Sequence, residues 1–168
     1  MAWVTTGAVM LAFAVLVPVA GASDASLLEA YRSHRKELRT AGEHYFKAVE
    51  RLEKNGASDK EFRALIRADY EINSVLRKIA KAMRAEQASS DHGRRAKRNG
   101  LEAILRWRKA NRFEITAARV RIHNREERAR YWIRRAIRQF RRGMKAEKRA
   151  RAAFRDAGLK PGQGIVGI

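Results

Sequence analysis

Apolar side chains recur three or four residues apart along most of the chain, which is the spacing of one face of an α-helix. One stripe begins after Ser26-x-x-Glu29 and a second after Ser58-x-x-Glu61, and both tetrapeptides match the capping box that opens helices. Asn55-Gly56 separates them, with a glycine that can take the left-handed conformation that ends helices. We therefore expect residues 23–90 to form an antiparallel helical hairpin. The stripes are Leu28, Tyr31, Leu38, Tyr45, Val49 and Leu52, and then Phe62, Leu65, Ile72, Leu76, Ile79 and Met83.

One polar side chain, Asp69, lies in register within the second stripe. Counting back from the turn places Tyr45 of the first helix opposite it. A hydrogen bond from the tyrosine hydroxyl would satisfy a carboxylate that is costly to bury alone. We therefore interpret both residues as packing residues of the hairpin.

The second half of the chain begins with a stretch rich in basic residues, of which we assign residues 91–100 as a basic linker. From Leu101 to Arg142 no proline or glycine interrupts the chain, and only His123-Asn124 suggests a break. Two architectures follow: four helices in an up-down bundle, or the hairpin plus one long helix over residues 101–157. Matched helix lengths favour the bundle. Both give an all-α fold with coiled-coil-like packing.

The two ends differ from the rest of the chain in composition. Residues 1–22 have no charged side chain and end in a small-x-small triplet, which is typical of a signal peptide cleaved before Ser23. No basic residue precedes the apolar run and its length could span a bilayer, so an uncleaved membrane anchor or a buried core helix are alternatives. Cleavage predicts a periplasmic or secreted protein, and an anchor predicts a tethered one. Residues 158–168 predict a flexible glycine-rich tail or a short docking peptide.

Positive charge is concentrated in the C-terminal half. The chain has 38 Lys and Arg against 18 Asp and Glu, a net charge of +20. Residues 24–90 hold 14 basic and 11 acidic side chains, whereas residues 91–168 hold 24 and 7. A charge of this size favours anionic partners and does not determine the fold. A function that uses the charge therefore belongs to the C-terminal half.

A helix over residues 128–155 would segregate its charge. At about 100° per residue, its basic side chains fall on one side of the axis, centred on Arg138, and its large apolar residues fall on the other. The predicted polyanion-binding residues are Arg128, Arg130, Arg134, Arg135, Arg138, Arg141, Arg142, Lys145, Lys148, Arg149 and Arg155, with Arg94, Arg95, Lys97 and Arg98 of the linker. The predicted packing residues are Ile133, Ile137, Phe140, Met144 and Phe154, with the small-residue row Ala129, Ala136, Gly143 and Ala150.

These patterns predict a non-enzymatic basic protein that binds a polyanion. An anionic lipid or envelope polymer is favoured by the export signal, and nucleic acid bound without sequence specificity is the other candidate. Trp107, Trp132 and Tyr131 could stack on unpaired bases, although core or boundary packing is the preferred interpretation. The alternative is a helical scaffold or chaperone-like envelope protein that forms a homo-oligomer through the small-residue row. A polyanion binder would bury that row within one chain.

Catalytic and metal-binding patterns are missing from the sequence. It contains no cysteine, and its four histidines form no His-Glu-x-x-His or Glu-x-x-His pair. No Gly-rich phosphate loop and no Gly-x-Ser-x-Gly elbow is present. We expect no catalytic residue, metal, cofactor or small-molecule substrate.

Overall fold

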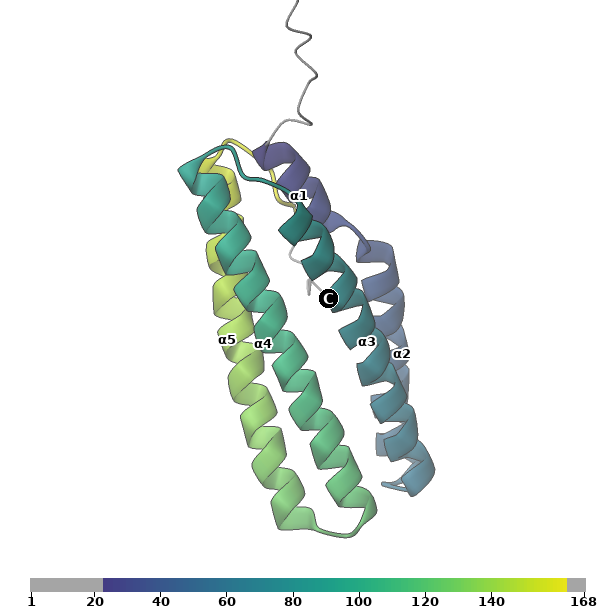
Figure 1. The fold of residues 1–168 in the computed structure, drawn as a ribbon. Coiled ribbons are helices and arrows are strands. Elements are labelled where there is room, and N and C mark those ends of the chain that lie inside the picture. The colour runs from purple at the N-terminus through teal and green to yellow at the C-terminus, as the bar shows by residue number, and fades with distance from the viewer. Residues whose placement is uncertain (1–22, 163–168) are drawn as a thin grey trace, which may run out of the picture.

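The computed structural model describes residues 23–162, whose regular structure is five α-helices without a strand (Figure 1). The helices are α1 (Asp24–Arg32), α2 (Arg35–Asn55), α3 (Asp59–Ala85), α4 (Asp91–Ile122) and α5 (Glu126–Asp156). The predicted all-α class is confirmed for this part of the chain. The predicted leader or anchor and the last six residues of the tail lie outside the described residues.

The four long helices run up and down as two hairpins, α2–α3 and α4–α5, and pack as a bundle (Figure 1). The first hairpin turns at Gly56, whose φ of 78° is readily adopted by glycine. The second turns at residues 123–125, where Asn124 has a φ of 56°, a value that asparagine tolerates better than most residues. The four-helix architecture is therefore confirmed, and the alternative of one helix over residues 101–157 is wrong.

The first predicted helix is divided into two. α1 ends at Arg32, and His34 takes a left-handed φ of 61° before α2 begins. The N-cap is Ser23, three residues before the predicted capping box, and its Oγ accepts a hydrogen bond from the Ser26 amide at 2.9 Å. α1 contacts both α3 and α4, whereas α2 packs on α3. The break lets α1 leave the line of α2 and bury its apolar face against both hairpins.

The basic linker predicted over residues 91–100 is wrong, because this segment is the first part of α4. The helix is capped by Ser90, whose Oγ accepts a hydrogen bond from an amide of the first turn at 3.0 Å. A β-carbon added at Gly100 would lie 2.7 Å from Cε of Met83, so small residues bring α4 close to its neighbours here. The packing face of this segment consists of glycine and alanine, so the periodicity of large apolar residues does not reveal it. The connection between the hairpins is residues 86–90.

The core is built around aromatic side chains that α1, α4 and α5 contribute. The rings of Tyr31 and Phe154 lie 5.5 Å apart between centroids, and both side chains are buried. Trp107 is 2% exposed and packs against Gly143. None of the helices within residues 23–162 is long and apolar enough to cross a membrane.

Candidate functional site

All eleven basic residues of the predicted cationic face lie on α5, and all but Arg135 are exposed. Two of them form ion pairs with acids: Arg130 with Glu126 at 2.8 Å and Arg149 with Glu102 at 3.1 Å. Eight have no ion-pair, hydrogen-bond or aromatic partner within residues 23–162. These eight, which we call the unpaired cations, are Arg128, Arg134, Arg138, Arg141, Arg142, Lys145, Lys148 and Arg155.

Arg135 is held differently, in an aromatic cluster between α4 and α5. Its guanidinium lies 4.8 Å from the ring centroid of Phe113, 5.3 Å from that of Trp132 and 5.6 Å from that of Tyr131. The rings of Phe113 and Trp132 are themselves 5.4 Å apart. Trp107 belongs to the core. The interpretation of the two tryptophans as core and boundary residues is therefore confirmed, and neither is a free stacking platform.

The four basic residues of the predicted linker have separate roles. Arg94 pairs with Asp91, and Arg95 contacts His92, each within the first turns of α4. Lys97 donates to the carbonyl oxygen of Arg84 at 3.1 Å, close to the end of α3. Because that bond occupies its ammonium group, Lys97 stabilises the end of a helix. Arg98 is exposed and has no interaction partner within residues 23–162.

The apolar residues of α5 divide into two sets, and only one set packs as predicted. The small-residue row is buried against α4, so closely that a β-carbon at Gly143 would lie 2.5 Å from Nε1 of Trp107. The large residues predicted to pack are instead 39–45% exposed, with the exception of Phe154. The small side chains let α4 pack closely on this face of α5. The large side chains, on another face of α5, are therefore directed towards the open side of the bundle. We call this exposed set the α5 stripe: Ile133, Ile137, Phe140 and Met144.

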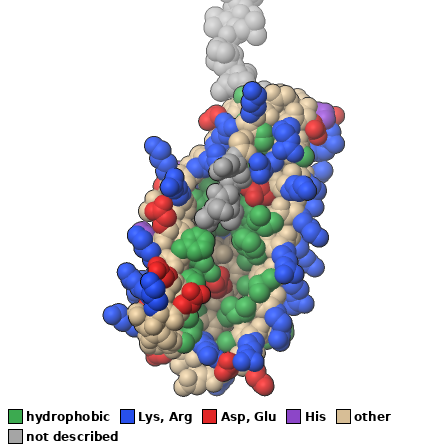
Figure 2. Space-filling model, turned by 180° about the vertical axis from the view of Figure 1, so that it is seen from behind, with side chains coloured by type: hydrophobic (Ala, Val, Ile, Leu, Met, Phe, Trp, Pro, Cys, Tyr) green, Lys and Arg blue, Asp and Glu red, His purple; other side chains and the backbone are tan. Residues whose placement is uncertain are grey.

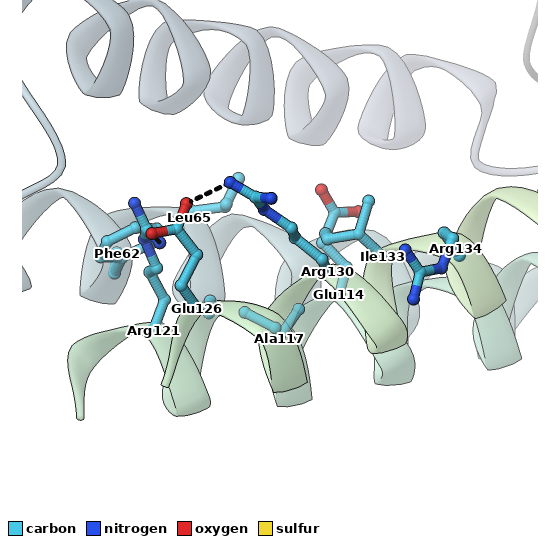
Figure 3. A pocket seen from close by; sticks show the side chains of 11 residues that line it. Phe62, Leu65, Glu114, Ala117, Arg121, Glu126, Arg130, Ile133 and Arg134 are labelled. Atoms are coloured by element: carbon cyan, nitrogen blue, oxygen red, sulfur yellow. Dashed lines mark hydrogen bonds and ion pairs between the residues drawn. The ribbon is translucent and has the colours of Figure 1, made fainter. Parts of the chain in front are cut away.

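The open side lies between α2 and α5. α2 packs on α3, α3 on α4 and α4 on α5, but α2 and α5 do not close the ring with a comparable contact. Figure 2 shows hydrophobic side chains gathered in the resulting furrow, with Lys and Arg side chains along its edges. Part of the furrow deepens into a pocket of about 410 Å³ between α3, α4 and α5 (Figure 3).

One buried and one half-buried acidic side chain, Asp69 and Glu114, lie near the floor of this furrow. Asp69 is 1% exposed, and neither of its carboxyl oxygens has a hydrogen-bond partner within residues 23–162. Tyr45 donates its hydroxyl proton to Oε1 of Glu114 on α4 at 2.5 Å. The predicted bond from Tyr45 to Asp69 is therefore wrong: the hydroxyl reaches across the bundle to a carboxylate on a different hairpin.

Burial controls the protonation of these acids. Burial in the first place, and then the nearby charge of Glu114, raise the pKa of Asp69 to about 9. Burial also raises the pKa of Glu114, against the opposing effect of the hydrogen bond from Tyr45. A raised pKa keeps Asp69 protonated at neutral pH, which avoids two adjacent buried charges.

In the sequence, Glu114 can be distinguished from a surface acid by its position in register with the buried residues of α4. It lies seven residues after Trp107 and four before Ala118, both buried, so it falls on the packing face of α4. It is also the single acid between Glu102 and Glu126, in a segment otherwise rich in arginine and lysine. Register and isolation together distinguish it from a solvated surface acid.

A further buried acid, Glu147, lies on α5. Its Oε1 accepts a hydrogen bond from the Tyr31 hydroxyl at 3.1 Å, and its side chain is buried. Burial, and then the charge of Glu147, raise the pKa of Tyr31 well above its usual value. The bond connects α1 to α5 and contributes to the closed end of the bundle.

No group of three or more His, Cys, Asp or Glu within residues 23–162 is arranged to hold a metal ion. No protein-family model, curated protein or solved structure matches this chain.

Proposed function

We propose that this chain binds an extended anionic surface, an anionic lipid membrane in the first place, through the cationic face of α5. The supporting observation is the set of eight unpaired cations. From Arg128 to Arg155 they cover about 40 Å of helix at 1.5 Å per residue. Like charges at this density repel one another, and an anionic partner would relieve that repulsion while releasing its counterions.

The contrast with α2 supports this interpretation. There the exposed cations are interleaved with acids, as in the Arg39–Glu43 pair at 3.2 Å and the Lys54–Glu50 pair at 2.6 Å. A merely soluble helix can follow the α2 pattern without loss. The absence of such pairing for eight of the eleven cations on the cationic face of α5, within residues 23–162, is therefore the feature that supports an anionic partner.

A membrane surface is favoured over nucleic acid by the α5 stripe. It lies beside the cationic arc on the same helix, and interfacial helices combine an apolar stripe with Lys and Arg in this way. A lipid surface can accept both kinds of side chain, whereas a phosphate backbone uses the cations alone. The aromatic residues that could stack on bases are in the core or engaged with Arg135.

The scaffold alternative has less support. The small-residue row through which a homo-oligomer was expected to form is buried against α4 in a single chain. An oligomer would have to use the α5 stripe instead. It would then bring two cationic faces together, which costs electrostatic energy at low ionic strength.

The test uses phosphatidylglycerol–phosphatidylcholine vesicles, phosphatidylcholine vesicles and duplex DNA, each at low and high salt. The triple variant Arg134→Glu, Arg138→Glu and Arg141→Glu should abolish binding to anionic vesicles and leave the helical circular dichroism signal intact. Its matched control reverses three exposed arginines on one face of α3: Arg63, Arg67 and Arg77. The control changes the net charge equally and should retain most of the binding.

Several results would contradict the proposal. They are binding to none of the anionic partners at low salt, binding that does not weaken with salt, or equal losses in the two triple variants. Binding to duplex but not to vesicles would identify nucleic acid as the polyanion. A salt-insensitive monomer–oligomer equilibrium without anion binding would support the scaffold.

A further inference from the structure

The pocket in the furrow has an apolar body and a charged end. Its body is formed by Phe62 and Leu65 of α3 and by small and apolar residues of α4 and α5, and the half-buried Glu114 of α4 also lines it. Its volume of about 410 Å³ lies within the range of about 300–1,000 Å³ that is usual for small-molecule sites. The contributions of α4 and α5 to the body are Ala117, Ala118, Ala129 and Ile133.

The charged end lies beside the α4–α5 turn (Figure 3). Glu126 accepts from Arg121 at 3.0 Å and from Arg130 at 2.8 Å, so one carboxylate is shared by two guanidinium groups. Arg134 lines the same pocket one turn further along α5 and has no partner within residues 23–162. In Figure 3 Arg134 lies at the other end of the pocket from Glu126, with Glu114 between them. The pocket as a whole is lined by three arginines and two acids, Glu114 and Glu126, which is an excess of positive charge.

An apolar path continues from the pocket along α5. Ile133 is both a pocket residue and the first member of the α5 stripe. Ile137, Phe140 and Met144 follow at intervals of four, three and four residues, which keeps them on one side of the helix. The path is about 17 Å long from its first to its last residue at 1.5 Å per residue.

We propose that the pocket and the α5 stripe bind the chain of a long-chain anionic amphiphile, a fatty carboxylate, with its headgroup at Arg134, since Arg130 is held by Glu126. The apolar body and path provide a surface of the right shape for an extended hydrocarbon chain. Charge complementarity selects the headgroup, because a carboxylate can receive hydrogen bonds from a guanidinium in a planar fork. A cationic amphiphile would be repelled by the same arginines.

Other occupants are less compatible with these contacts. A second copy of the chain would place another set of unpaired cations against the first. A neutral apolar chain would leave Arg134 without a partner at the pocket. The amphiphile site lies beside the cationic arc and shares Arg134 with it, but it does not depend on the proposed membrane function, since a single dissolved molecule would occupy it.

The test measures calorimetric binding of hexadecanoate, below its micelle concentration, to the full chain. Hexadecanol and hexadecyltrimethylammonium are the neutral and cationic comparisons. We expect saturable binding of one hexadecanoate per chain, with the alcohol at least about ten-fold weaker because it lacks the charge-assisted hydrogen bonds. The cation should not bind.

Two variants locate the site. Ile133→Asp places a negative charge in the pocket wall, and Arg134→Gln removes the unpartnered guanidinium. Both positions are exposed, so both proteins should fold. Each should weaken hexadecanoate binding about ten-fold or more. The matched controls are Leu105→Asp, at an apolar residue of α4 that is 60% exposed, and Arg138→Gln, one turn along α5 from Arg134.

The outcomes separate this site from the proposed membrane function. No saturable binding of hexadecanoate, equal binding of the alcohol, or unchanged affinity in both pocket variants would overturn the amphiphile proposal. A chain that binds hexadecanoate but no anionic vesicle would retain this site and refute the membrane proposal. A chain that binds anionic vesicles but not hexadecanoate would support the membrane proposal and refute the amphiphile site.

Discussion

Gly143 of α5 lies against the indole ring of Trp107 on α4, at a distance that leaves no room for a methyl group. A β-carbon at this position would be 2.5 Å from Nε1 and 2.6 Å from Cδ1 of the ring. The contact sets how closely the two helices approach. That approach in turn decides which face of α5 is buried and which is left on the open side of the bundle.

The first prediction follows from this contact. Gly143→Ala improves helix propensity by about 1 kcal/mol but overpacks a rigid ring at a cost of about 1–3 kcal/mol. We expect a net loss of up to about 2 kcal/mol in the free energy of unfolding, measured by urea denaturation. Arg142→Ala, at the exposed neighbouring position, should change it by less than about 0.5 kcal/mol. A more stable Gly143→Ala protein would show that α4 and α5 can separate without cost.

The second prediction concerns Asp69 and pH. Its pKa is about 9 in the folded chain, against an ordinary value of 3.8 for an aspartate. Between these two values the folded state binds more protons than the unfolded state, so this group makes stability fall as pH rises. Asp69→Asn removes the titration. The variant should gain about 1–3 kcal/mol relative to the native chain between pH 5 and pH 8.5, measured by denaturation at both values. A difference independent of pH would contradict the assignment.

The third prediction tests the bond from Tyr45 to Glu114. Tyr45→Phe removes the donor and leaves a partly buried carboxyl without its partner, which should cost about 1–3 kcal/mol of unfolding free energy. Tyr70→Phe is the matched control, because Tyr70 is 48% exposed and its hydroxyl accepts only from exposed Arg119. The control should change stability by less than about 0.5 kcal/mol. Equal effects of the two substitutions would show that Glu114 gains nothing from Tyr45.

The fourth prediction concerns repulsion among the unpaired cations. Salt screens it, so added sodium chloride should raise the melting temperature of the native chain at low ionic strength. The triple reversal at Arg134, Arg138 and Arg141 should raise the melting temperature at low salt and reduce its salt dependence. The α3 control triple should do so less, because its arginines are not part of the run of unpaired cations on α5. No difference between the triples would show that only net charge matters.

The fifth prediction concerns the leader. If residues 1–22 are a signal peptide, intact-mass analysis of protein expressed with them should give a chain that begins at Ser23. That residue would remain as the N-cap of α1, with its Oγ accepting from the Ser26 amide. Full-length protein retained in the membrane fraction would support the anchor instead.

Local patterns predicted much of the fold. The turn at Gly56, the break after Ile122 and the clustering of charge on one side of α5 each depend on neighbours within a few turns. The helix over residues 91–100 was not predicted, because its packing residues are glycine and alanine, whose role depends on how closely another helix approaches.

The sequence by itself determined the helices, most of their ends and the cationic arc of α5, because these follow from backbone preferences and the helical repeat. Only the tertiary structure decided which apolar set on α5 is buried. The small-residue row is the buried set because Gly143 and its neighbours let α5 approach α4 closely enough to cover Trp107. The same packing leaves the α5 stripe exposed and brings Tyr45 to Glu114, 69 residues away in the sequence. Such contacts depend on the relative placement of helices, which no periodicity within one helix specifies.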